Sequence, residues 1–160
     1  MSLTDRFKAA MGSWASGVSV VTTRHGDLLY GLTVSSLASV SAEPPLVSVC
    51  INNDNRAVTM IQESGWYAVS VLGSAQKDAS NYFARSGREP TEGFVEVDGR
   101  WTDSGLPIVQ GALAWLVCDV VHAVPAGSHT LFIGQVTDAG SDPDAAPLIY
   151  WRRGYRAITP

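Results

Sequence analysis

Small hydroxyl side chains are concentrated in residues 31–52, GLTVSSLASVSAEPPLVSVCIN. Successive side chains of a strand point to opposite faces of its sheet. Thr33 and Ser35 should therefore lie opposite Leu32 and Val34. The later part of the segment shows the same alternation, with Ser48, Cys50 and Asn52 on one face and Val47, Val49 and Ile51 on the other. The segment predicts two strands with one apolar face in a core and one face of short polar groups.

Two neighbouring strands with short donors and acceptors can bind a flat molecule that has polar edges. A flavin ring is such a molecule, because its pyrimidine edge alternates acceptors with an N–H donor. Ser and Thr are also common on the solvent face of antiparallel strands. The hydroxyl pattern taken alone therefore leaves an ordinary solvent-facing surface as the alternative.

The segment NNDNRAVT follows the second of these strands and begins a predicted helix. Asn55, Arg56 and the amides of the first helical turn could hold a nucleotide phosphate, because cations and helix N-termini attract anions. The same residues also fit a simple turn and helix cap with a solvated Arg56. No GxGxxG motif follows the first strand, so a Rossmann dinucleotide site is not predicted.

A β-rich scaffold must position these residues. The pattern predicts a short N-terminal helix that Thr4 or Asp5 caps, a hairpin over residues 18–36, and further strands over residues 46–52 and 66–72. Helices are expected within residues 55–65 and 75–87, a loop over residues 88–98, and long antiparallel strands over residues 111–158. Many strands, few short helices and no βαβ alternation favour a closed antiparallel barrel over a doubly wound sheet.

Composition narrows the function classes. A chain of 160 residues with 46% hydrophobic and 16% charged residues is typical of one well-packed domain. The net charge of −4 and the scattered basic residues argue against nucleic-acid binding. Cys50 and Cys118 stand alone in apolar runs, which indicates reduced thiols and no metal site. Without an apolar run long enough for a bilayer, we expect a cytoplasmic protein that does not bind membranes.

The order of several motifs is similar to that of a known family. The motifs are FKAAMGSWASGVSVVTT, YGLTVSSLASVSAEPPLVSVCIN, GWYAVSVL, FARSG, GALAWLVCDVV, AGSHTLFIGQV and PLIYWRRGYRAI. Together they resemble the flavin reductase-like family of FMN-binding split barrels, and the likeness runs over nearly the whole chain. The resemblance implies a single domain over residues 1–160. It also implies a mostly β fold, an antiparallel six-stranded Greek-key split barrel with a few short flanking helices, assembled as a homodimer.

The resemblance also implies a reaction and its participants. NADH or NADPH would give a hydride to FMN or FAD, and the reduced flavin would pass to a separate flavin-dependent oxygenase. The expected contacts to the flavin ring and ribityl chain are Thr33, Val34, Ser35 and Ser36, with Cys50, Ile51 and Asn52 bordering the ring largely through their backbone. Phe83 and Ala84 would lie along the nucleotide.

His129 in AGSHTLFIG matches the family histidine that sits beside the nicotinamide and the flavin, and it is the expected catalytic residue. Arg152 and Tyr155 could contact the nicotinamide nucleotide, although an exposed polar edge explains them as well. The chain departs from the family at Asn55-Arg56-Ala57, where relatives often have Ser-x-Thr. Arg56 would have to replace the missing phosphate-binding hydroxyl.

Three functions remain open at this point. The first is a reductase that treats the flavin as a diffusible substrate and supplies it to a monooxygenase. The second is an oxidoreductase of the same fold that keeps its FMN and reduces another acceptor. The third is a flavin-binding protein without turnover. The sequence does not distinguish FMN from FAD, or NADH from NADPH.

Overall fold

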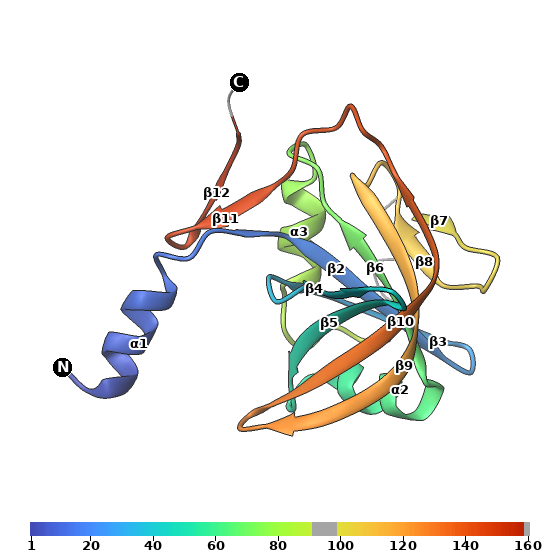
Figure 1. Ribbon diagram of the computed structural model, residues 1–160, viewed down its shortest axis with the longest axis horizontal. Helices are drawn as coiled ribbons and strands as arrows, with labels where there is room; N and C mark the ends of the chain where they lie inside the picture. The colour runs from blue at the N-terminus through green and yellow to red at the C-terminus, as the bar shows by residue number, and fades with distance from the viewer. Residues whose placement is uncertain (91–98, 159–160) are drawn as a thin grey trace.

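The computed structural model describes residues 1–90 and 99–158 (Figure 1). The predicted loop over residues 88–98 lies mostly outside this range. The helices are α1 (Leu3–Met11), α2 (Arg56–Ser64) and α3 (Lys77–Phe83). The strands are β1 (Ser16–Gly17), β2 (Ser19–His25), β3 (Leu28–Val34), β4 (Ala38–Ala42), β5 (Pro45–Asn52), β6 (Trp66–Val71), β7 (Gly99–Trp101), β8 (Pro107–Val109), β9 (Ala114–Ala126), β10 (His129–Ser141), β11 (Ile149–Trp151) and β12 (Gly154–Arg156).

The main sheet is antiparallel and has the strand order β3-β2-β6-β9-β10-β5-β4. The prediction of a mostly β, antiparallel fold with a few short helices is confirmed. The sheet contains seven strands rather than the expected six, because residues 38–42 pair with β5 as an additional edge strand. Among the described residues, no ladder joins β3 to β4, so hydrogen-bonded pairing does not close this sheet into a barrel.

The main core lies between the curved sheet and helix α2. Its buried members include Val49 and Ile51 from β5, Tyr67 from β6 and Phe132 from β10, each at most 1% exposed. Helix α2 adds Ile61, and burying a side chain of this kind contributes about 1.5–3 kcal/mol. The apolar face predicted for β5 is confirmed, because its Val and Ile side chains form this core, whereas Ser48 of the predicted polar face is buried as well.

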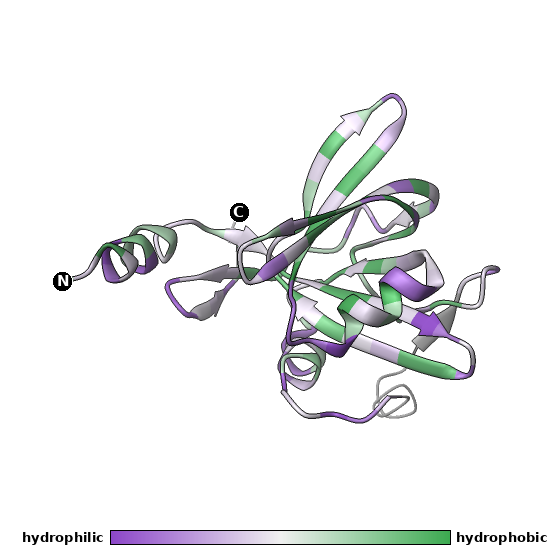
Figure 2. Cartoon of the chain, turned by 90° about the horizontal axis from the view of Figure 1, so that it is seen from below, coloured by the Kyte–Doolittle hydropathy of each residue, from purple (hydrophilic) through white to green (hydrophobic). Residues whose placement is uncertain are grey.

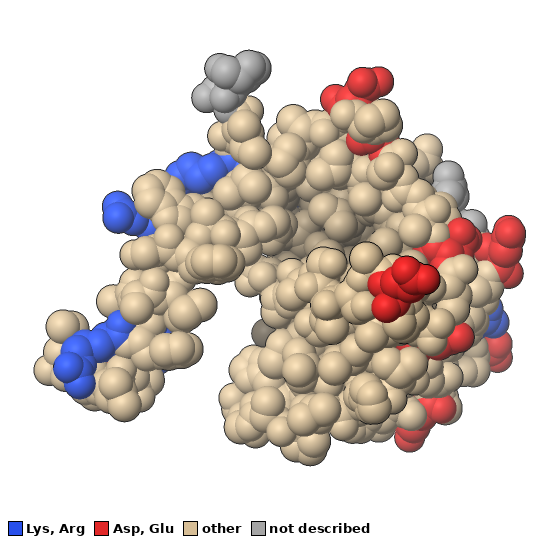
Figure 3. Space-filling model, viewed as in Figure 1, with Lys and Arg blue, Asp and Glu red and all other residues tan. Residues whose placement is uncertain are grey.

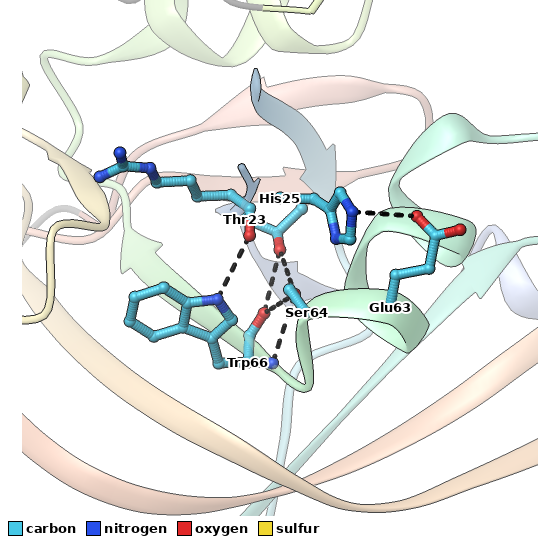
Figure 4. A network of polar contacts seen from close by, with 6 residues as sticks. Thr23, His25, Glu63, Ser64 and Trp66 are labelled. Atoms are coloured by element: carbon cyan, nitrogen blue, oxygen red, sulfur yellow. Dashed lines mark hydrogen bonds and ion pairs between the residues drawn. The ribbon is translucent and has the colours of Figure 1, made fainter. Parts of the chain in front are cut away.

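Helix α2 is held at both ends. The Asn55 side chain accepts a hydrogen bond from the Ala57 amide, and Gly65 ends the helix in the left-handed conformation with a φ of 77°. Beyond this end, Thr23 donates to the carbonyl of Trp66 at 3.0 Å, and Ser64 joins the same network (Figure 4). These contacts tie the C-terminal end of α2 to β2 and β6. At the other end, the Asn55 amide donates to the Asn52 carbonyl at 2.9 Å, which places the N-terminus of α2 beside the end of β5.

A second core cluster lies beneath helix α3. It contains Val18, Val20, Leu72, Phe83, Val109 and Leu148. Phe83 is only 2% exposed and belongs to this cluster. The apolar ring at the end of α3 packs the helix against the sheet, so only the backbone of Phe83 could lie along a nucleotide, and that contact stays a prediction.

Helix α1 and the β11–β12 hairpin lie at the edge of the molecule, and α1 projects away from the sheet (Figure 1). A capping box between Ser2 and Asp5 starts α1, but none of its residues is buried. Residues of apolar type occur on α1 and along the long strands (Figure 2). In the view of Figure 3, Lys and Arg gather over α1 and the nearby hairpin, whereas Asp and Glu lie on the opposite side. None of the helices in residues 1–90 and 99–158 has the length and apolar character needed to cross a membrane.

Candidate functional site

The end of β5 and the start of β10 bring His129 next to Asn52. The two residues are directly paired in the antiparallel ladder, so their side chains share one face of the sheet. The Asn53 amide donates to the Ser128 carbonyl at 2.9 Å, and Thr130 donates to the Asn53 side-chain oxygen at 2.7 Å. The histidine therefore has a firmly held backbone, and the structure places it beside the polar face of β5.

The ring of His129 is oriented by its neighbour. Its Nδ1 lies 2.9 Å from the Ser128 hydroxyl, and the side chain is half-buried. Two residues further along each strand, Leu131 pairs with Cys50 and continues the same face. The face thus combines an imidazole, an amide, a thiol and an aliphatic group, which suits a flat ligand with polar edges.

Two of the hydroxyls predicted to face a ligand make hydrogen bonds within the protein. Ser36 Oγ accepts from the Cys50 amide at 3.0 Å and donates to the Cys50 carbonyl at 2.9 Å. Thr33 Oγ1 donates to the Ser80 carbonyl at 2.7 Å. The hydroxyl donors of Ser36 and Thr33 are therefore used within the protein, and the expected contacts of these residues with the flavin stay predictions. Ser35 is exposed, and its hydroxyl has no partner within the described residues.

Ser35 and its neighbours line a cavity between β3, α3 and the C-terminal hairpin, with a volume of about 220 Å³. It contains the predicted residues Thr33, Val34, Ser35, Ala84 and Tyr155, together with Val18, Ser80 and Tyr150. The side chain of Val34 is mostly buried in the main core, so this residue contributes mainly backbone to the cavity. The structure thus brings the β3 residues together with Ala84, although they are far apart in the chain.

Tyr155 is held against α3. Its hydroxyl lies 2.7 Å from Ser80 Oγ and 3.0 Å from Asn81 Oδ1, and its ring packs edge-on against Tyr150. Arg152 stands in the turn of the same hairpin with a φ of 48°, and its guanidinium lies 4.5 Å from the centre of the Trp151 ring. The hairpin lies far from the turn between β9 and β10 (Figure 1). Within one chain, Arg152 and Tyr155 therefore lie apart from His129, and their expected contact with the nicotinamide nucleotide stays a prediction.

A larger polar cavity lies at the N-terminus of α2 and has a volume of about 410 Å³. Its lining contains the predicted residues Asn52, Asn55 and Arg56, together with Tyr30, Asp54, Ser86, Gly87, Arg88 and Glu89. We call it the α2 cavity. Arg56 Nη1 lies 3.4 Å from a Glu89 carboxylate oxygen. Asn52 lines this cavity and also pairs with His129, so the α2 cavity continues from the polar face of β5.

Arg88 was missed by sequence reasoning, which assigned it to a loop. It is only 7% exposed, and its Nε and Nη2 donate to the backbone carbonyls of Arg85, Gly31 and Phe83. Its guanidinium carbon lies 5.0–5.4 Å from the ring centres of Phe83, Tyr30 and Tyr82. No feature of the sequence separates Arg88 from a solvated loop arginine, because its partners come from β3 and α3.

None of the clear pKa shifts among the described residues belongs to a residue that lines these two cavities; hydrogen bonds from Ser2 lower the pKa of the exposed Asp5 on α1, and the other shifts are in the core. Burial raises the pKa of the Cys118 thiol to about 12, and burial also raises the pKa of Tyr67, whose hydroxyl neighbours that thiol. Both groups are therefore neutral at physiological pH. They take part in packing, and the face beside His129 contains neither of them.

Comparison with known proteins identifies the family. The model of the flavin reductase like domain matches residues 11–159. The chain belongs to this family. An NADH-dependent flavin reductase from a Rhodococcus species is 38% identical over 155 residues, which cover 94% of this chain and 84% of that protein. The reductase component of 4-hydroxyphenylacetate 3-monooxygenase from Thermus thermophilus is 35% identical over 154 residues and 96% of each chain.

Solved structures of the flavin reductase family have the same overall fold. The flavin reductase PheA2 is 37% identical, with a TM-score of 0.88 and full coverage of both chains. The NADH:FAD oxidoreductase SgcE6 of Streptomyces globisporus, solved with NAD and FAD fragments, is 31% identical. It matches with a TM-score of 0.93 over 100% of this chain and 96% of that one.

Proposed function

We propose that this protein is an NAD(P)H-dependent flavin reductase that supplies reduced FMN or FAD to a separate monooxygenase. The observation that carries the proposal is the pairing of His129 with Asn52, which lines the α2 cavity, in a chain of the flavin reductase-like family. Relatives named as reductase components of monooxygenases support the role of a partner oxygenase.

The residues present fit a flavin nucleotide. The polar face of β5 offers the thiol of Cys50 and the side-chain amide of Asn52 to a flat ring, whereas the backbone amide and carbonyl of Cys50 are already bonded to Ser36. The α2 cavity offers the N-terminus of α2 and the side chains of Asn55 and Arg56 to a phosphate. The Asn55 side-chain oxygen already caps the helix, so the amide nitrogen is the group of Asn55 that remains for a ligand.

The protein contributes binding and orientation to the reaction. When bound, a flavin supplies the ring system that accepts the hydride. The strands β5 and β10 hold the ring face, and His129 borders the position of the nicotinamide. Ser128 restricts the imidazole through Nδ1. Such positioning accelerates transfer because it removes the entropy cost of bringing two reactants together.

We further propose that the protein acts as one domain in a homodimer. Leu3, Phe7, Met11 and Trp14 of the N-terminal region are 50–74% exposed, and apolar surface of this kind favours a protein interface. The free thiols of Cys50 and Cys118 fit a cytoplasmic location.

Rapid mixing with NADH or NADPH tests the reductase function. We expect loss of the absorbance of oxidised FMN or FAD on mixing, and the absence of this change with both nucleotides would refute the proposal. Gel filtration separates the alternatives. Activity that persists afterwards without added flavin would favour an oxidoreductase with a permanently bound FMN, and binding without turnover would favour a flavin-binding protein.

A further inference from the structure

The α2 cavity contains a buried positive charge without a counter-ion. Arg88 is 7% exposed and forms no ion pair in the part of the chain that the structure describes. Its hydrogen bonds go to neutral carbonyl groups, and its Nη1 has no hydrogen-bond partner. Burying an unpaired charge costs free energy unless an anion pairs with it or further acceptors take its hydrogen bonds. The contacts with three aromatic rings compensate for this cost only in part.

The other charged groups of the cavity do not satisfy Arg88. The Glu89 carboxylate lies 3.4 Å from Arg56, and the two form an ion pair. Asp54 is exposed and lines the same cavity, so it would oppose an incoming anion. Arg88 is therefore the charged group of this cavity with which an anionic ligand would form an ion pair. The N-terminus of α2, which also attracts anions, lies on the same cavity wall.

The position of the cavity indicates which anion it receives. Asn52 both lines the cavity and pairs with His129 on the polar face of β5. A flavin whose ring lies on that face can therefore extend its phosphate toward Arg88. We propose that Arg88 recognises the flavin phosphate and makes this protein select FMN and FAD over riboflavin. The inference rests on the proposed flavin site, and it explains how the chain can lack the family's Ser-x-Thr hydroxyls.

Comparing FMN with riboflavin tests this role, because the two molecules differ only in the phosphate. The dissociation constants of both oxidised flavins are measured by fluorescence without NADH, for the wild type, Arg88→Gln and Arg88→Lys. We expect Arg88→Gln to weaken FMN binding at least about tenfold, as for loss of a charged hydrogen bond. Riboflavin binding should change less than about twofold, and Arg88→Lys should retain part of the preference.

Arg85→Gln is the matched control, because Arg85 belongs to the same segment and stacks on Tyr82 but does not line the cavity. It should leave both dissociation constants near wild type. Equal weakening of FMN and riboflavin by both Arg88 variants would show that Arg88 only maintains the structure, and would overturn the inference. Because these measurements need no turnover, a wild type that binds FMN through Arg88 but never reduces it would refute the reductase function alone.

Discussion

Replacing Ser36 with alanine tests whether this hydroxyl supports the fold or binds a ligand. Ser36 Oγ bridges the amide and the carbonyl of Cys50 at 3.0 and 2.9 Å. These contacts join the chain after β3 to the backbone of β5, next to the end of the β4 ladder, where Ala38 pairs with Ser48. In Ser36→Ala both backbone groups of Cys50 lose this partner.

Loss of two hydrogen bonds at about 0.5–1.5 kcal/mol each should destabilise the protein by about 2 kcal/mol. For a chain of this length, that corresponds to a decrease in Tm of about 4–8 °C. Urea unfolding should show a lower midpoint with an unchanged m value, because the surface exposed on unfolding stays the same. Flavin binding should weaken as well, since Cys50 and Asn52 form the expected edge of the ring site.

Ser35→Ala and Ser36→Thr are the controls. Ser35 is exposed and makes no hydrogen bond in the described structure, so its replacement should change stability by less than about 0.5 kcal/mol. Ser36→Thr keeps the hydroxyl and should restore most of the lost stability. If Ser36→Ala keeps the wild-type Tm yet binds flavin more weakly, the bridging role is refuted, and Ser36 contacts the ligand directly as the sequence suggested.

Three further predictions concern the core and the site. In Gly134→Ala the new Cβ would lie 2.8 Å from the Cys118 Cβ and against the Tyr67 hydroxyl, so calorimetry should show a loss of about 1–3 kcal/mol or more; a wild-type Tm would contradict this packing. Because burial raises the pKa of Cys118 from 9.0 to about 12, the unfolded thiol ionises first as pH rises. The unfolding free energy should fall by up to about 1.4 kcal/mol per pH unit above about pH 9. Urea titrations at about pH 8 and pH 10 should show a smaller decrease for Cys118→Ala, and equal decreases would argue against the shift. His129→Ala should raise the KM for NADH about tenfold and that for FMN less than about twofold in steady-state assays, whereas equal changes would remove His129 from nicotinamide placement.

The strand pattern could be predicted because alternation is a local property of the chain. Val49 and Ile51 are buried while Asn52 is exposed, as the pattern of β5 requires. The additional strand β4 was not predicted. Its residues are small and mostly exposed, so they show little apolar alternation, and pairing with β5 defines the strand.

The position of the histidine could be predicted only with the help of the family resemblance. A single His beside Ser and Thr resembles an ordinary turn residue, and its pairing with Asn52 depends on the register between β10 and β5. The burial of the Phe83 ring likewise depends on tertiary packing. Its motif resembles a nucleotide-contacting segment, whereas the packing of α3 buries the ring.

The sequence by itself determined the mostly β architecture, the apolar and polar faces of β5, and the membership of the flavin reductase-like family. Only the tertiary structure decided which polar groups remain available to a ligand. Thr33 donates to the Ser80 carbonyl, 47 residues away in the sequence, and Arg88 donates to the Gly31 carbonyl, 57 residues away. Each hydrogen bond uses a donor that sequence patterns treat as free or solvated. Hydrogen-bond partners of this kind depend on how distant segments pack, because each buried donor must find its acceptor in the folded chain.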